Sequence, residues 1–344
     1  MKIYVTGAYG PSQEFDSLRE LGHEVVLGRP VDQPGRQPYT EEELVEWCRD
    51  ADVIMASHLD TITRPVLEAA ERLRLVVVPY IGVDKIDVGA ATELGIVVAN
   101  SPTPQNFHGV AEATIAFMLM LLKRIKRNEA KLRRGEWAQR LDRGWLLSGK
   151  TIGLVGFGRV STQVARRLQG WDVRLLACDP YVAPEAARPL RVTLVPLTTL
   201  LMESNVVSLH ATLTAKTRHM IGEKELRSMK RTAFLINTAR GELVDENALY
   251  RAIDESWIAG AALDVFEQEP LPMESRLRRL DPERVILTPH NASHTEAGRL
   301  ANLKLALEST LSAVRGEVPK HTVNPPAAAR WRERFGPKKV GGLR

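Results

Sequence analysis

Residues 151–179 constrain the fold more than any other part of this sequence. They open with a short apolar run rich in β-forming residues, Thr151–Val155, which predicts a buried strand. Gly156 and Gly158 follow directly, then a helical pattern and a second apolar run that ends in Asp179. A strand, a glycine turn, a helix and a strand that ends in a carboxylate form a βαβ unit of the kind that binds a dinucleotide.

Each residue of this unit has a physical part in the expected binding. Gly156 permits a tight turn and Gly158 lets the backbone approach the pyrophosphate, while the N-terminus of the following helix faces the anion. Asp179 lies 18 residues after Ser161, the small residue at the third motif position, close to the ~20 expected for an acid that accepts from the ribose 2′-OH. No cation follows Asp179 directly, and its charge would repel a 2′-phosphate, so the sequence favours NAD (NADH) over NADP.

Length and composition limit the remaining possibilities. The chain has 344 residues, enough for two domains. Its residues are 44% hydrophobic and 26% charged, a composition that is ordinary for a soluble globular protein. No basic and apolar leader opens the sequence, and the longest apolar run, 115–122, is too short to cross a membrane. Cys48 and Cys178 lie in unrelated segments, so we expect a reduced, cytoplasmic protein, and the sequence indicates no metal site.

The net charge of +5 arises at the end of the chain. Residues 323–344 include six basic residues and one acidic residue, which accounts for the whole excess. We therefore expect residues 321–344 to form a basic, flexible tail, and we do not expect nucleic-acid binding. A second basic run, 123–134, is expected to be the solvated end of a helix.

A strand–helix rhythm continues on both sides of the βαβ unit. Strands are expected at 2–6, 23–27, 51–56, 75–79 and 95–99 before it, and at 206–210, 233–237, 258–264 and 285–288 after it. This alternation predicts an α/β fold with two doubly wound parallel-sheet domains. Residues 7–10 lack the phosphate pattern and are expected to be a turn. We assign residues 1–100 and about 290–320 to a substrate domain, and residues 101–289 to the dinucleotide-binding domain.

Three polar residues follow three of the expected strands. Arg240 comes after the strand at 233–237, Glu269 after that at 258–264, and His290 after that at 285–288. Ligands of open α/β sheets bind outside the carboxyl ends of the strands, so the three side chains can converge near the cofactor. Hydride transfer at a carbon that bears oxygen needs a proton carrier such as His, which a carboxylate can orient, and an Arg fork fits a substrate carboxylate.

Each member of this trio also has an ordinary structural alternative. Arg240 could be a salt-bridge former, Glu269 a turn acid and His290 a structural histidine. Their shared position after strand ends is what favours the functional interpretation.

The sequence also resembles a known family. The segments GLVGFGRV, CDPY, SLHATLTAKTRHMI, LINTARGELVDENAL, IAGAALDVFEQEPLP and VILTPHNASHT, preceded by GVDKIDVGAATELGIVVANSP and VAEATIAFML, resemble the D-isomer-specific 2-hydroxyacid dehydrogenase family over about residues 50–315. The resemblance implies a flavodoxin-like substrate domain, a Rossmann-like NAD domain, and NAD-linked interconversion of D-2-hydroxy acids and 2-keto acids. It also implies a homodimer, with the helix near Val110 at the interface.

The resemblance assigns roles residue by residue. The family's catalytic arginine, glutamate and histidine fall on Arg240, Glu269 and His290. Besides Gly156 and Gly158, the implied cofactor-binding residues are Arg159, Val160, Asp179, His210, Thr238, Ala239, Arg240, Asp264, His290 and Ser293. The implied substrate-binding residues are His58, Tyr80, Ile81, Gly82 and Arg240, with the backbone N–H groups of Ile81 and Gly82 on the substrate carboxylate.

Two departures from the family pattern bear on the substrate. Asn291 stands where the family has an apolar residue, and His58 stands where phosphoglycerate-specific relatives have an arginine for the phosphate. A histidine is only partly charged at neutral pH, so we expect a small unphosphorylated acid: glyoxylate, hydroxypyruvate or glycerate. A 3-phosphoglycerate dehydrogenase and an NAD-sensing, corepressor-like binding protein on the same scaffold remain open alternatives. Formate oxidation is disfavoured, because formate-oxidising relatives carry glutamine at the position of Glu269.

Overall fold

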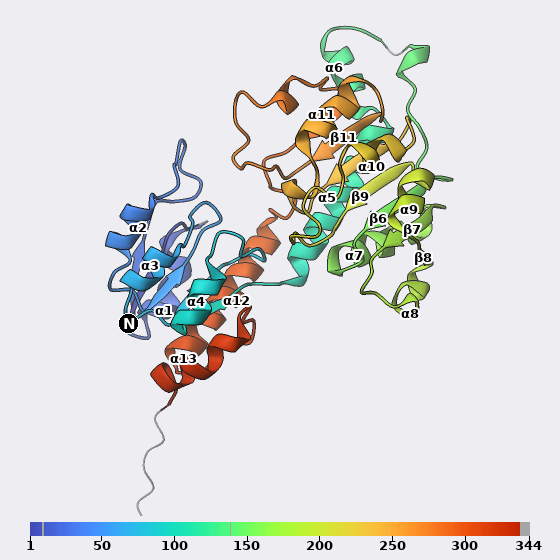
Figure 1. Ribbon diagram of the computed structural model, residues 1–344. Helices are drawn as coiled ribbons and strands as arrows, with labels where there is room; N and C mark the ends of the chain where they lie inside the picture. Colours follow the sequence, from blue (N-terminus) through green and yellow to red (C-terminus); the bar gives the residue numbers. More distant parts are fainter. Residues whose placement is uncertain (9, 138, 338–344) are drawn as a thin grey trace, which may run out of the picture. The chain divides into compact units, whose positions relative to one another are not determined.

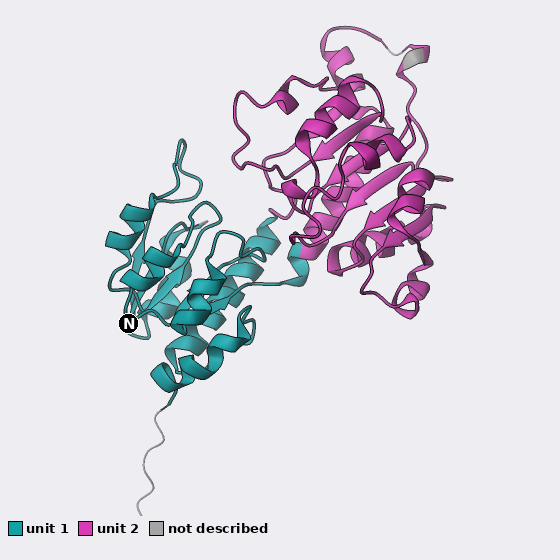
Figure 2. Ribbon diagram, viewed as in Figure 1, with its two compact units in different colours: residues 1–106, 295–344 teal, residues 107–294 magenta. Residues whose placement is uncertain are grey.

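The computed structural model describes residues 1–8, 10–137 and 139–337, and the chain divides into two compact units (Figure 2). Unit 1 comprises Met1–Asn106 with Thr295–Arg344, and unit 2 comprises Phe107–His294. From the sequence, the two boundaries are expected near residues 100 and 290. Of the turn expected at 7–10, Tyr9 lies outside the described residues.

Unit 1 is built on a five-stranded parallel sheet with the strand order β2-β1-β3-β4-β5. Its strands are β1 (Lys2–Val5), β2 (Glu24–Leu27), β3 (Val53–Met55), β4 (Leu75–Val77) and β5 (Val97–Ala99). Its helices are α1 (Asp16–Arg19), α2 (Glu41–Trp47), α3 (Arg64–Ala69), α4 (Val88–Leu94), α12 (Glu296–Val314) and α13 (Ala328–Phe335) (Figure 1).

Alternate residues of each strand bury opposite faces of this sheet, because side chains repeat every two residues. Tyr4 of β1 packs into a core with α2, α3 and α4, whereas its neighbours Ile3 and Val5 pack into a second core with α1 and α12. Both faces of the sheet are therefore covered, as the continuous apolar strands predict.

The expectation of a flexible C-terminal tail is wrong for residues 321–337, which pack into the core of unit 1. Trp331 of α13 has 0% exposure and packs in the same core as Ile3 and Val5, and its Nε1–H donates to Arg74 O at 2.7 Å. Asn324 accepts from Val98 N at 2.8 Å. One large aromatic side chain and one side-chain amide thus anchor the segment. Its basic composition gave no sign of this packing. Lys338, Lys339 and Arg344 lie outside the described residues.

Unit 2 is built on a seven-stranded parallel sheet with the order β12-β11-β10-β9-β6-β7-β8. Its strands are β6 (Thr151–Val155), β7 (Arg174–Cys178), β8 (Val192–Leu194), β9 (Val206–Leu209), β10 (Phe234–Asn237), β11 (Gly260–Leu263) and β12 (Val285–Leu287). Its helices are α5 (Pro104–Leu122, which starts in unit 1), α6 (Ile125–Arg133), α7 (Arg159–Arg167), α8 (Pro184–Ala187), α9 (Leu197–Glu203), α10 (Glu223–Ser228) and α11 (Glu246–Asp254).

The strand order of unit 2 reverses between β6 and β9, because the chain runs outward from β6 to β8 and then returns to β9 and proceeds to β12. Ligands of doubly wound sheets bind at such a reversal, beyond the carboxyl ends of the strands. Helices α9, α10 and α11 cover one face of the sheet, and α5 and α7 cover the other. Together the two sheets form the α/β architecture that the sequence predicts.

Part of the basic run after α5 is paired with acidic residues. Lys131 pairs with Asp142 at 2.7 Å, and Arg127 pairs with Asp142 at 3.3 Å and with Glu283 at 3.2 Å. Among the helices of the described ranges, none combines the length and the apolar character that a bilayer crossing requires.

Candidate active site

The glycine turn after β6 has the geometry that its sequence predicts. Gly156 has a φ of +88°, and a Cβ there would lie 2.7 Å from the backbone N of Ala211, at the end of β9. Gly158 caps α7, and a Cβ there would meet no atom within 4 Å. In the described part of the chain no side chain caps α7, so its first N–H groups are open to an anion. The turn can therefore hold a diphosphate.

Asp179 ends β7 next to this turn. Its Oδ2 accepts from Phe157 N at 2.8 Å and its Oδ1 accepts from Tyr181 N at 2.9 Å. Each carboxylate oxygen has a further lone pair, so the group can still accept from a hydroxyl. The Asp179 carboxylate is thus held beside the glycine turn, where an acidic residue that binds the ribose is expected.

His210 lies on the other side of the strand-order reversal, after β9. Its Nε2 is 2.9 Å from Ser208 Oγ, and burial lowers its pKa to about 4. The imidazole is therefore neutral near pH 7. If it contacts a ligand, as the sequence predicts, it does so without supplying a charge.

The loop after β10 is organised by Asn237, a residue that the sequence analysis did not single out. Its side chain donates from Nδ2 to Arg240 O at 2.8 Å and accepts from Ala239 N at 3.1 Å. Thr238 contacts Thr114 of α5, with 3.1 Å between the two hydroxyl oxygens. A polar residue at the end of an apolar strand was the available signal, since such a residue often shapes the loop that follows.

Glu269 and His290 form a direct pair, with 2.7 Å between Oε2 and Nδ1. The Glu269 side chain is 30% exposed and the His290 side chain is 45% exposed, so the imidazole can meet a ligand. Burial raises the pKa of Glu269, but the hydrogen bond and charge of His290, the Phe266 N–H and the charge of Arg240 outweigh burial and hold the pKa below its usual value. The carboxylate is therefore charged near pH 7, and Arg240 lies within its electrostatic reach.

Asp264 fixes the turn that carries His290. It is 1% exposed and accepts from Thr288 Oγ1 at 2.6 Å, from Asn291 N at 3.0 Å and from Ala292 N at 2.9 Å. These bonds account for the φ of 50° at His290. The sequence indicates only a cofactor-binding part for Asp264 and gives no signal of this second one. Ser293, the next residue of the turn, packs against Gly109 of α5.

The residues expected to contact the substrate lie in unit 1, after β3 and β4. His58 belongs to a loop held by Asp60, which is 1% exposed and accepts from Ser57 Oγ at 2.6 Å and from Arg36 Nη2 at 2.7 Å. Neither Asp60 nor Arg36 was singled out from the sequence, because they are separated by an irregular loop that gives no periodic signal.

Tyr80, Ile81 and Gly82 follow β4. Asn100 Nδ2 donates to Ile81 O at 2.8 Å, which holds this loop in place. Across residues 1–8, 10–137 and 139–337, no acceptor is found for the N–H groups of Ile81 and Gly82. Two adjacent open N–H groups can bind a carboxylate.

Within unit 2, the expected cofactor residues and the trio all follow the carboxyl ends of strands, and the contacts of the described residues join Glu269 directly to His290, with Arg240 in electrostatic reach. Arg159 lies with its guanidinium carbon 5.2 Å from the ring centre of Phe107, and Val160 follows it in the first turn of α7. The four expected substrate residues of unit 1 also follow strand ends of their own sheet.

The sequence of this chain is similar to a family model and to two named relatives. A family model described as "D-isomer specific 2-hydroxyacid dehydrogenase, NAD binding domain" matches residues 115–292. A glyoxylate reductase of Thermofilum pendens is 39% identical over 328 residues, which is 94% of each chain. A D-3-phosphoglycerate dehydrogenase of Methanocaldococcus jannaschii is 41% identical over 288 residues, 83% of this chain but only 54% of that protein, so this chain spans about half of that relative.

A solved structure has the same architecture. The crystal structure of the TT0316 protein from Thermus thermophilus superposes with a TM-score of 0.84 at 33% identity, and the match covers 94% of this chain and 100% of that one. The likeness therefore extends over both units and not only over the dinucleotide-binding part.

Proposed function

This chain belongs to the D-isomer-specific 2-hydroxyacid dehydrogenase family, and from that premise we propose that it reduces a small, unphosphorylated 2-keto acid to the D-2-hydroxy acid. Unit 2 carries the family's NAD-binding domain, so the cofactor is NAD. The observation that carries the proposal is the Glu269–His290 pair, 2.7 Å apart at the carboxyl ends of the strands of that same domain.

The residues present fit the cofactor. The open space at Gly158 and the uncapped start of α7 suit the diphosphate, and Asp179 suits an adenosine ribose that bears a free 2′-OH. Arg159 and Val160, in the first turn of α7, would line the diphosphate. His210, Thr238, Asp264 and Ser293 form the remainder of the cofactor-binding set that we propose.

Reduced NAD supplies a hydride to the keto carbon when it is bound, and the trio handles the charge and the proton. Arg240 binds the substrate carboxylate and polarises the keto oxygen. His290 holds Nδ1–H on Glu269, so its Nε2–H faces the keto oxygen and passes its proton to it as the C–O bond becomes an alcohol. Glu269 favours the charged imidazole before transfer and fixes the ring orientation during it.

The substrate class follows from unit 1. The open N–H groups of Ile81 and Gly82 take the substrate carboxylate, and Tyr80 lies beside them. A histidine, His58, stands where phosphate-binding relatives have a permanently charged arginine, so we infer glyoxylate or hydroxypyruvate, the latter giving glycerate, rather than a phosphorylated acid. The relative named glyoxylate reductase, which matches over 94% of its length, supports this choice. The relative named D-3-phosphoglycerate dehydrogenase makes the phosphorylated acid the alternative to test.

A substrate panel tests the proposal. Glyoxylate, hydroxypyruvate, pyruvate, phenylpyruvate and 3-phosphohydroxypyruvate are each assayed with NADH and with NADPH. We expect the highest kcat/KM for glyoxylate or hydroxypyruvate with NADH. A preference for the phosphorylated acid would overturn the substrate assignment, and no turnover of any of the five would overturn the enzyme assignment.

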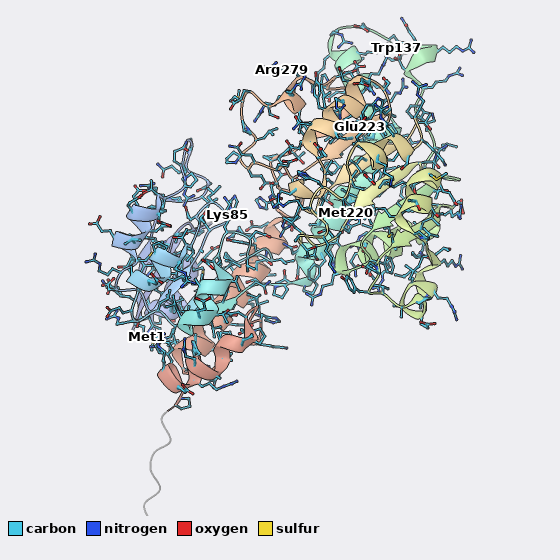
Figure 3. The ribbon with its side chains drawn as sticks, viewed as in Figure 1. Met1, Lys85, Trp137, Met220, Glu223 and Arg279 are labelled. Atoms are coloured by element: carbon cyan, nitrogen blue, oxygen red, sulfur yellow. The ribbon has the colours of Figure 1, made fainter. Side chains whose placement is uncertain are left out.

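We also propose that the protein is a homodimer, joined through the region of α5 and α6. Large apolar side chains are exposed in this region: Leu132 of α6 is 61% exposed, and Trp137, which follows α6 and is labelled in Figure 3, is 80% exposed. Surfaces of this kind are commonly interfaces. Light scattering of a Leu132→Ser/Trp137→Ser variant should show a lower mass than wild type. Met273→Ser, a change at a separate residue that is 81% exposed, is the control and should leave the mass unchanged.

We propose a cytoplasmic location as well. Cys48 and Cys178 are both free thiols, which supports a reducing compartment. Cell fractionation that found the protein at its natural level in a membrane or extracytoplasmic fraction would contradict this.

A further inference from the structure

The start of α11 and the loop after β11 bind each other through an exchange of hydrogen bonds. Glu246 N donates to Glu267 Oε1 at 3.0 Å, and Glu267 N donates to Glu246 Oε1 at 2.8 Å. Each glutamate thus binds the other's backbone, although 21 residues separate them. Neither side chain has a part in the mechanism proposed above.

This exchange holds the loop that carries Glu269. Two residues beyond Glu267, the Glu269 carboxylate accepts from Phe266 N at 3.0 Å and meets His290 Nδ1 at 2.7 Å. The loop is therefore closed on itself by the Phe266 bond and tied to α11 by the Glu246–Glu267 bonds. A shift of Glu267 would carry the Glu269 carboxylate with it.

The same loop lies against the segment that carries Arg240. A Cβ on Gly241 would lie 1.9 Å from the carbonyl carbon of Phe266 and 2.4 Å from Glu267 N, so the two backbones touch. Backbone contact therefore sets the position of the Arg240 loop relative to the Glu269 loop. The Glu246–Glu267 hydrogen bonds then attach the Glu269 loop to the start of α11.

A second imidazole–carboxylate pair involves Glu267 of the same loop. His219 Nε2 is 3.2 Å from Glu267 Oε1, and His219 N donates to Glu242 O at 2.7 Å. His219 directly precedes Met220, and the start of α10 at Glu223 follows soon after; both are labelled in Figure 3. Glu267 is thus held from two sides, by α11 and by the segment before α10.

We propose that Glu246 and Glu267 are positioning residues for the reductase: by binding each other's backbone they fix the loop of Glu269, and with it the place of the His290 ring. The proposal rests on the proposed function of the Glu269–His290 pair. It assigns no proton transfer to either residue.

Charge is the competing explanation, because carboxylates gather around Glu246. Burial raises the pKa of Glu246, and the charges of Glu267, Glu242 and Glu269 raise it further, against the Glu267 N–H bond that lowers it. Among the residues that the structure describes, the basic side chains facing these carboxylates are Arg218, His219, Arg240 and His290. A test must therefore separate the hydrogen bond from the charge.

Three variants at one position make that separation. Glu246→Gln keeps an acceptor of the same length without the charge, Glu246→Asp keeps the charge but is one methylene too short, and Glu246→Ala keeps neither. Asp is favoured in the first turn of a helix, so the Asp variant should fold even if the Ala variant does not. Glu223→Ala is the matched control, since Glu223 also begins a helix and forms ion pairs but does not touch the 266–269 loop.

We expect kcat for the keto acid to fall about tenfold in the Asp and Ala variants while KM for NADH stays within about twofold, because a misplaced proton carrier slows the chemical step without weakening cofactor binding. Glu246→Gln should recover most of the loss. Wild-type kcat in the Asp variant, or a Gln variant as slow as the Ala variant, would overturn the proposal.

Hydrogen exchange of the free protein gives a readout that does not depend on turnover. The amide of Glu267 should exchange at least about tenfold faster in Glu246→Ala and Glu246→Asp than in wild type, and at the wild-type rate in Glu223→Ala. Unchanged protection would overturn the proposal even if activity fell. Should wild type turn over no keto acid at all, the proposed function fails instead, and the exchange rates still decide whether the two glutamates hold the loop.

Discussion

At His290 the backbone has a φ of 50°, a region that residues other than glycine and asparagine seldom enter. The side chain of Asp264 stabilises that turn from below, and the carboxylate of Glu269 holds the ring from beside it. Residues with uncommon backbone angles persist only where surrounding contacts determine them, and they concentrate at functional sites. The left-handed backbone conformation at His290 turns the chain after β12 so that the imidazole contacts Glu269.

The imidazole of His290 is expected to be the proton donor. His290→Ala should lower kcat for keto-acid reduction by ~10²–10⁴, because a positioned general acid contributes about that much. The dissociation constant for NADH, measured by fluorescence quenching, should change by less than about threefold, since diphosphate and ribose contacts are untouched. A kcat within about threefold of wild type would refute the assigned role.

The charge of Glu269 is expected to set the pH range of the reaction. Its pKa is held below the usual value, so in wild type it stays ionised through neutral pH and favours the protonated ring of His290. In Glu269→Gln the side chain is neutral and no longer stabilises a positive charge on its partner. The alkaline limb of the kcat profile for reduction should therefore move to lower pH, and pH-rate profiles of the two proteins should show it. Superimposable alkaline limbs would count against the pair.

At the scale of elements, patterns of local residues predicted most of what positions the site. The β6–turn–α7–β7 unit was predicted from glycine spacing and strand composition. Strand β8 was not predicted, because three residues at the edge of a sheet give too short a pattern.

What the sequence could not predict are contacts between elements that lie close only after folding. The Glu246–Glu267 exchange and the Asp264 bonds to the His290 turn join residues 21 to 28 positions apart. No spacing rule links them, because their distance depends on the loop after β11. The trio itself was accessible because all three residues follow ends of parallel strands, which topology alone brings to one edge.

Gly241 is the position where this contact between elements is tightest. Gly241→Ala would place a Cβ 1.9 Å from the Phe266 carbonyl carbon, so the Arg240 and Glu269 loops must move apart. We expect a loss of ~1–3 kcal/mol in the free energy of unfolding, as for other overpacked sites, together with a fall in kcat. Gly170→Ala is the control, because a Cβ there meets nothing within 4 Å. Chemical denaturation and steady-state kinetics of both variants would show the difference, and equal behaviour would contradict it.

At the scale of the whole molecule, the chain leaves unit 1, forms unit 2, and returns to complete the first sheet's core. Figure 1 shows α12 and α13, the red helices, among the blue and teal elements of unit 1. Alternation of strands and helices predicted two parallel sheets, but composition misled at the C-terminus. Charge dominates the average over residues 321–344, whereas one buried aromatic decides whether such a segment packs.

Trp331 tests whether the C-terminal segment is part of the fold of unit 1. Because the side chain has 0% exposure and donates from Nε1 to Arg74 O, Trp331→Ala leaves a cavity and removes one of the two hydrogen bonds that this carbonyl accepts, the other coming from Val97 N at 3.2 Å. Truncations of large buried aromatics cost ~3–5 kcal/mol, so the unfolding transition of unit 1, followed by hydrogen exchange of its strand amides, should weaken by about that amount. The exposed neighbour Arg332, replaced by Ala, should change it by less than ~0.5 kcal/mol. Protection of β1 and β4 equal to wild type in Trp331→Ala would mean that the segment contributes no core to unit 1.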